Sequence, residues 1–207
     1  MATSVGIDPG VLHLGLAAKT DDDSVLVQEL SFPKEGIDGV VGDYLRCTAL
    51  CDDLYDWLLA CIRPMATRLR VNTKRGKQLV NSPIITVEGP ALARGGTRTV
   101  QVGFLHMAIY TALCRLRSLT LVVCPPMVLK KRVTGKGNAS KEAMMEGILK
   151  RWFSGDIPSF GNQNIYEAYA LARLGEEVVL GVPPSWMQGK VQVYTISEGS
   201  IHDITIR

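Results

Sequence analysis

The chain lacks the features that mark membrane, secreted or zinc-binding proteins. It contains no run of 18 or more apolar residues, which a helix that crosses a membrane needs. Its first residues, M-A-T-S-V-G-I-D, do not form the basic-then-apolar leader of a secreted protein. Its five cysteines are odd in number and include no C-x-x-C pair, so neither a disulfide framework nor a zinc site is expected. We therefore expect a soluble, cytoplasmic protein with reduced thiols and no membrane partner.

The chain also has little imbalance of charge. Its net charge of +3 is too small to imply a nucleic-acid partner by itself, although basic residues cluster in segments 65–82 and 128–141. With 207 residues, of which 46% are hydrophobic and 21% charged, the composition is that of a globular protein with a real core. One domain is expected, with room for a small appendage.

Apolar periodicity predicts elements in the order βββ-α-β-α-β-α-α. Short apolar runs bounded by turn residues predict strands, and apolar residues at helical spacing predict helices. The expected strands are 4–8, 13–19, 24–30, 84–88 and 119–123, and the expected helices are 43–62, 105–116, 140–152 and 165–180. This order predicts an α/β domain over residues 1–184, in which a mixed five-stranded sheet carries helices on both faces.

Two segments lie outside this plan. Residues 65–82 are rich in Lys and Arg and form a basic insertion between a helix and a strand. Residues 185–207 contain two alternating stretches, V-Q-V-Y-T-I and I-H-D-I-T-I, which predict a C-terminal β-hairpin. The hairpin is expected to pair with a sheet edge or with a partner subunit.

Two predicted strands end in a carboxylate just before a turn. Asp8 precedes Pro9-Gly10, and Glu88 precedes Gly89-Pro90. A single acid in such a place can cap the turn by accepting backbone N–H bonds. If the two strands are parallel neighbours, however, both carboxylates emerge at one sheet edge, where they repel unless a cation lies between them. Hard oxygen ligands in that arrangement suit Mg²⁺ or Mn²⁺.

A third acid is available at the start of the last predicted helix, N-I-Y-E-A-Y-A-L-A. Asn164 and Glu167 are three residues apart and therefore share a helix face. The same spacing is also that of a capping box, in which Asn164 would cap the helix. The spacing leaves both interpretations open.

Four motifs together resemble the RuvC-type Holliday-junction resolvases of the ribonuclease H-like superfamily. V-G-I-D-P-G and I-T-V-E-G-P resemble that family's first two catalytic strands, V-L-K-K-R-V-T-G-K-G-N-A-S-K its basic loop, and N-I-Y-E-A-Y-A-L-A its D-x-x-D-A-x-A-L-A helix. The motifs fall in family order and span residues 4–175. The resemblance, closest in shape to phage-type members, implies a ribonuclease H-like fold and a homodimeric endonuclease. Such an enzyme cuts four-way DNA junctions in a bacterial or phage-infected cell with two Mg²⁺ ions, which Mn²⁺ can replace.

The resemblance also assigns roles to residues. It implies that Asp8, Glu88 and Glu167 are catalytic metal ligands, and it places Asn164 where the family has another Asp, so that the site is one charge short. It implies that Lys141 stabilises charge near the scissile phosphate. The implied DNA-binding residues are Lys130, Lys131, Arg132, Lys136, Arg94, Arg98 and Leu92. The loop A-L-A-R-G-G-T-R matches the segment that inserts into the junction, with Ala91 and Leu92 in place of the usual aromatic wedge.

Three other functions compete with junction resolution. A YqgF-type nuclease that processes ribosomal RNA would share the fold and the site but differ in substrate. A junction-binding protein with weak catalysis is suggested by Asn164. An actin-like ATPase also begins with a glycine-flanked Asp, but it needs a second phosphate loop and an adenosine motif that this chain is too short to hold.

Overall fold

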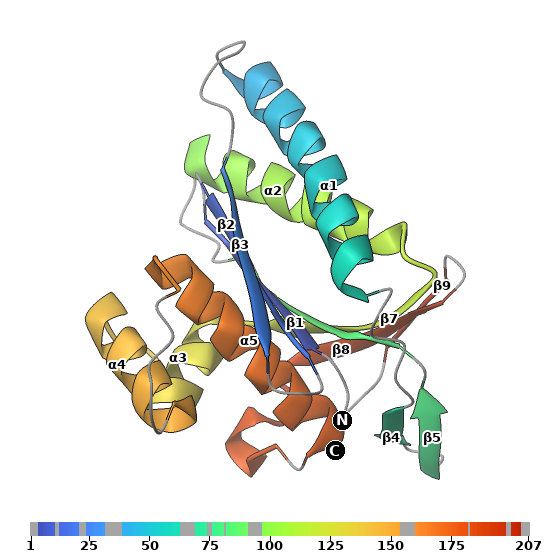
Figure 1. Ribbon diagram of the computed structural model, residues 1–207, viewed down its shortest axis with the longest axis vertical. Coiled ribbons are helices and arrows are strands. Elements are labelled where there is room, and N and C mark those ends of the chain that lie inside the picture. Colours follow the sequence, from blue (N-terminus) through green and yellow to red (C-terminus); the bar gives the residue numbers. More distant parts are fainter. Residues whose placement is uncertain are drawn as a thin grey trace.

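The computed structural model describes residues 4–10, 13–20, 24–31, 39–62, 69–73, 76–80, 82–90, 97–153, 160–181, 183–197 and 200–203. Its centre is a seven-stranded sheet in the order β3-β2-β1-β6-β7-β8-β9 (Figure 1). The strands are β1 (Ser4–Pro9), β2 (His13–Lys19), β3 (Val25–Ser31), β6 (Ile84–Glu88), β7 (Ser118–Cys124), β8 (Gln192–Ser197) and β9 (Ser200–Asp203). Strands β1, β6 and β7 are parallel, and the other pairings are antiparallel. The predicted mixed sheet is confirmed.

The C-terminal hairpin belongs to this sheet. After the short 3-10 helix η2 (Ser185–Met187), β8 pairs antiparallel with β7 and β9 pairs with β8. The five predicted strands are therefore the first five of seven, and the hairpin extends the sheet at its β7 edge. Within the predicted basic insertion, β4 (Leu69–Thr73) and β5 (Gly76–Val80) form a separate two-stranded sheet, whose side chains lie outside the described part of the chain.

Helices cover both faces of the sheet, as predicted. Figure 1 shows α1 (Val40–Ile62) and α2 (Thr97–Cys114) on one face, and α3 (Pro126–Thr134), α4 (Lys141–Trp152) and α5 (Gln163–Leu180) on the other. Each layer encloses its own cluster of buried apolar side chains. Within the described ranges, no helix has the length and apolarity to cross a membrane.

Helix α3 occupies a segment for which the sequence predicts a basic loop. Pro126 is its first residue, where a missing backbone N–H costs no hydrogen bond. Gly135 ends the helix with a φ of 80°, and its N–H donates to the carbonyl oxygen of Lys131. This left-handed cap favours glycine. The turn between α3 and α4 is therefore confined to residues 135–140.

Helix α5 lies directly against the backbone of β1. A Cβ atom on Gly6 would overlap the carbonyl oxygen of Ala168 and approach the backbone nitrogen of Ala172 to 2.6 Å. Ala168 and Ala172 are fully buried, and their small side chains allow this close approach. A residue with a side chain at Gly6 would therefore push the helix away from the strand.

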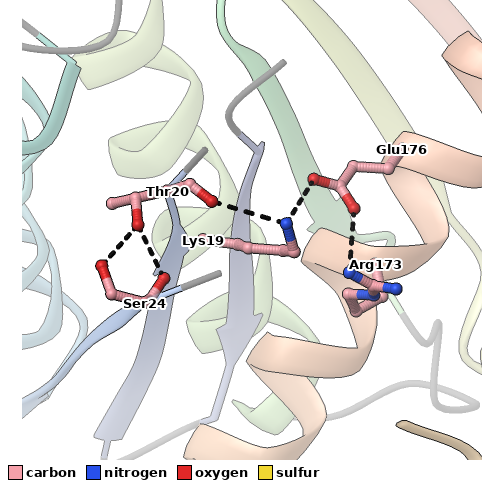
Figure 2. Close-up of polar contacts among 5 residues, drawn as sticks. All are labelled: Lys19, Thr20, Ser24, Arg173 and Glu176. Atoms are coloured by element: carbon pink, nitrogen blue, oxygen red, sulfur yellow. Dashed lines mark hydrogen bonds and ion pairs between the residues drawn. The ribbon is translucent and has the colours of Figure 1, made fainter. Parts of the chain in front are cut away.

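A buried ion pair fastens the far end of α5. Lys19, at the end of β2, places its Nζ 3.7 Å from Glu176 Oε1, and Arg173 Nη1 lies 3.4 Å from Glu176 Oε2 (Figure 2). Lys19 pairs with Ser4 on β1, four residues before Asp8, a rise of about 13 Å along the strand. Glu167 precedes Glu176 by nine residues, a rise of about 13.5 Å along the helix. Fastening Glu176 at Lys19 therefore brings Glu167 over Asp8.

Candidate metal centre

Three carboxylates from three elements meet at one edge of the sheet. Because β1 and β6 are parallel and Ile7 pairs with Val87, Asp8 and Glu88 emerge side by side at the carboxyl ends of their strands. Helix α5, which packs on one face of the sheet, contributes Glu167. One oxygen from each carboxylate lies within 4.8 Å of the other two. We call these three residues the acidic triad.

The acidic triad is buried enough to perturb its own titration. Asp8 is 6% exposed, and this burial is the main cause that raises its pKa well above the ordinary value. Repulsion from Glu88 and Glu167 raises the pKa further, and the Lys141 ammonium offsets only part of the rise. Burial and then Glu167 raise the pKa of Glu88 to about 7. A side-chain interaction between Asp8 and Glu88 raises the pKa of Asp8 further and acts against the rise in the pKa of Glu88.

The donor set fits a hard divalent cation. Carboxylate oxygens are the ligands that Mg²⁺ and Mn²⁺ prefer, and their mutual repulsion disappears when a cation lies among them. No other group of three or more His, Cys, Asp or Glu side chains with this spacing occurs in the ranges that the structure describes. The arrangement can therefore hold a divalent metal ion at the carboxyl edge of the sheet.

Two neighbours position the triad, and neither is recognisable in that role from the sequence. His106 on α2 is buried, and its Nε2 lies 3.0 Å from the backbone carbonyl oxygen of Glu88, while its Nδ1 lies 2.9 Å from that of Val102. Gln163 Nε2 donates to Glu167 Oε1 over 3.0 Å. The apolar stripe around His106 predicts only its burial, and a glutamine four residues before Glu167 is common on any helix.

Asn164 does not cap α5. The cap is Asn162, whose side chain accepts a hydrogen bond of 3.2 Å from the N–H of Ile165. The capping interpretation of Asn164 is therefore wrong, because the helix begins two residues earlier than that interpretation required. Asn164 Nδ2 instead donates to Glu29 Oε1 on β3 over 3.3 Å. Its role as a metal ligand stays a prediction.

The structure brings two of the predicted basic residues to the triad. Lys141 is the first residue of α4 and is close enough to Asp8 to offset part of its raised pKa. Burial is the main cause that raises the pKa of Glu88, and Lys130 on α3 offsets part of that rise. The cationic groups of α3 thus stand on a helix and not in a loop.

The other predicted DNA-binding residues contact other groups, are exposed, or lie outside the described residues. Lys131 Nζ lies 4.7 Å from the centre of the Trp186 ring, Lys136 is exposed, and Arg132 Nε donates to Glu177 Oε2 over 2.6 Å. Leu92 and Arg94 fall outside the described residues, and so does the side chain of Arg98 in the first turn of α2. DNA binding by this group stays a prediction.

Comparison with solved structures identifies the fold. The chain is similar to the Thermus thermophilus RuvC structure, with a TM-score of 0.56 and 17% sequence identity over 82% of this chain and 90% of that one. It is also similar to T. thermophilus RuvC in complex with a Holliday junction substrate, with a TM-score of 0.55 and 16% identity over 83% of this chain and 90% of that one. No protein-family model and no curated protein matches the sequence. The element order, the parallel strands that carry Asp8 and Glu88, and these neighbours together show that the chain has the RuvC-type, ribonuclease H-like fold.

Proposed function

We propose that this protein is a metal-dependent endonuclease that resolves four-way DNA junctions. The observation that carries the proposal is the acidic triad, with Lys130 and Lys141 beside it. Support comes from the fold, because a RuvC with the same architecture is known in complex with a Holliday junction substrate. Asp8, Glu88 and Glu167 would hold Mg²⁺, for which Mn²⁺ can substitute, and we propose two ions per site.

Each protein group has a distinct part in phosphodiester hydrolysis. A bound divalent cation supplies a nucleophilic water at neutral pH and stabilises charge on the phosphate. The triad fixes where that chemistry takes place, and Lys141 stabilises negative charge that develops on the scissile phosphate. Lys130, Lys131 and Lys136 hold the DNA backbone through its phosphates.

A cleavage assay tests the proposal. A synthetic mobile four-way junction, a linear duplex and a single-stranded RNA are incubated with the full chain, with Mg²⁺ and without it. We expect paired nicks in the junction only, and only with metal. Asp8→Asn should lower the rate by about a thousandfold or more, as loss of a central catalytic group does, while junction binding survives. Asp203→Asn, which removes an exposed carboxylate on β9, is the matched control and should cut normally.

Two outcomes would redirect the proposal. Preferential cutting of RNA would favour a YqgF-type nuclease, and metal-independent binding without cutting would favour a junction-binding protein. We also propose a homodimer, because two symmetric cuts in a two-fold junction need two active sites. Leu105, Ile109 and Leu116, in and just after α2, are buried in the core, and we propose that the exposed face of this helix provides the interface. A monomer in sedimentation velocity, with and without junction DNA, would exclude the dimer.

A further inference from the structure

A fourth carboxylate lies in the same row of the sheet as Asp8. Gly15 on β2 pairs with Asp8 on β1 and also with Glu29 on β3. Residues directly opposite each other in antiparallel strands direct their side chains to the same face. Asp8, Gly15 and Glu29 therefore form one row, with both carboxylates on the face that α5 covers.

The glycine in the middle of this row makes room for Asn164. A Cβ atom on Gly15 would overlap the backbone carbonyl oxygen of Asn164 and lie 3.0 Å from its Cβ. The first turn of α5 thus rests on the bare backbone of β2, between the strands that carry Asp8 and Glu29. Asn164 also lies one helical turn before Glu167, on the same helix face.

Glu29 holds one end of the Asn164 amide. Its Oε1 accepts from Asn164 Nδ2 over 3.3 Å and lies 3.6 Å from Nδ1 of His13. An amide coordinates a cation only through its oxygen, because the NH₂ group is a donor. A carboxylate that accepts from the NH₂ end therefore leaves the oxygen end available for a cation and polarises it toward negative charge.

We propose that Glu29 is a positioning residue that makes Asn164 an oxygen ligand of the metal centre. Glu29 does not contact the cation itself, but through Asn164 it supplies the negative charge that an amide lacks. This inference rests on the proposed function, since it needs a cation at the acidic triad. It parallels the carboxylates that orient metal-binding histidines from behind.

Direct coordination by Glu29 does not fit the geometry. Neighbouring strands lie about 4.8 Å apart, so Glu29 starts about 10 Å from Asp8 across the sheet. Among the described residues, the group of acids with metal-ligand spacing consists of Asp8, Glu88 and Glu167, without Glu29. Glu29 therefore acts through Asn164.

A double-mutant cycle with a binding readout tests this role. Mn²⁺ binding to the full chain without DNA is measured by the electron paramagnetic resonance signal of the free ion. Glu29→Gln should weaken Mn²⁺ binding by about tenfold, as loss of a partner behind a ligand does. In the Asn164→Asp background the effect of Glu29→Gln on Mn²⁺ binding should change sign, because Glu29 then lies beside a carboxylate. There, adding Glu29→Gln should tighten binding a few-fold, since a like charge is removed.

Three results would overturn the inference, and they are distinguishable. Unchanged Mn²⁺ binding by Glu29→Gln would remove Glu29 from the site. Equal weakening by Glu29→Gln in the unchanged protein and in the Asn164→Asp background would show a general charge effect that does not pass through residue 164. Mn²⁺ binding that Glu88→Gln leaves unchanged would exclude the metal site itself, and with it the proposed function. Asp203→Asn controls for loss of one surface charge, and thermal unfolding without metal checks that each variant folds.

Discussion

Glutamate side chains are partly buried near both ends of α5, but the charged groups around them differ. At the C-terminal end, burial raises the pKa of Glu176, and Lys19 and Arg173 act against that rise. At the N-terminal end, burial raises the pKa of Glu88 to about 7, and Glu167 adds to the rise. One end is an ion pair, and the other is a group of like charges.

This difference in electrostatics distinguishes an ion pair that stabilises the fold from the site at which we propose metal binding. The Glu176 carboxylate has Lys19 beside it, so its charge is balanced without a bound ion. This ion pair fixes the helix on the sheet. Three carboxylates that repel one another, with Asp8 buried and the two glutamates half-buried, cost free energy unless a proton or a cation joins them. Of the two ends of α5, this repulsion occurs at the N-terminal end, where β1 and β6 both end in acidic residues. The Lys19 end therefore positions the helix, and the Asp8 end is where our proposal places the chemistry.

The largest effect on stability is expected from breaking the ion pair. Lys19→Met removes the buried ammonium beside the half-buried Glu176 carboxylate, and removing one partner of a buried pair costs about 3–5 kcal/mol. We expect the free energy of unfolding in urea, followed by circular dichroism, to fall by that order. The double variant Lys19→Met/Glu176→Leu should recover most of the loss. A fall below about 1 kcal/mol for the single variant would mean that the pair does not fasten α5.

The pH dependence of the metal-free protein should reveal the triad. The pKa of Glu88 is about 7 in the folded state, against 4.5 ordinarily, so between these values the folded state holds a proton that the unfolded state has lost. Stability should therefore fall as pH rises from about 4.5 to 7, by about 3 kcal/mol.

Two additions sharpen the pH experiment. Glu88→Gln should reduce the dependence, because one of the two carboxyl groups with a raised pKa is gone. Saturating Mg²⁺ should flatten it as well, because a cation replaces the proton at the same carboxylates. Stability that rises with pH across this window in the metal-free protein would contradict the triad's electrostatics.

Removing a charge from the triad should change the free energy of unfolding in the opposite direction to removing a charge from the ion pair. Asp8→Asn removes a buried like charge, so it should raise the free energy of unfolding of the metal-free protein by about 1–2 kcal/mol. The same variant loses cleavage in our proposal, which is the usual exchange of function for stability at an active site. Thermal unfolding in the presence of a chelator measures the gain. A loss of stability would show that Asp8 has a structural role.

The smallest effect concerns two basic residues of α3, of which Arg132 forms an ion pair with Glu177 and Lys130 lies beside the triad. Lys130→Ala should reduce the slope of log affinity against log salt for junction DNA by about 0.9, the share of one phosphate contact. Arg132→Ala should change the slope less, because Glu177 already accepts from that guanidinium, and should instead lower stability. Equal slopes for Lys130→Ala and the unchanged protein would remove Lys130 from the DNA surface.

The parts of the site that follow from strand ends could be predicted from the sequence. Asp8 and Glu88 each stand between an apolar strand and a turn, and parallel pairing alone brings such residues together. Ser140 likewise stands directly before α4, at the start of the expected helix 140–152, and its side chain accepts from the N–H of Ala143. These features depend on neighbours along the chain, which the sequence displays.

The parts that depend on tertiary contacts could not be predicted. The stretch F-G-N-Q-N offers two asparagines as caps, and only the path of the chain selects Asn162 over Asn164. Helix α3 was missed because its Lys and Arg residues and the glycines after it resemble a loop, although Pro126 marks a helix start. Glu29 resembles any solvent-facing residue of an edge strand, and its contact with Asn164 spans 135 residues of sequence.

The contact between Gly6 and α5 has a consequence for the thermodynamics of ion capture. Gly6 allows the helix to rest on β1, Gly15 seats its first turn, and Lys19 fastens its far end, so α5 cannot slide along the sheet. The conformational entropy of gathering three acids is therefore lost when the chain folds and not when a cation arrives. An ion that enters this edge meets ligands already in place, so little of its binding free energy is spent on ordering the protein.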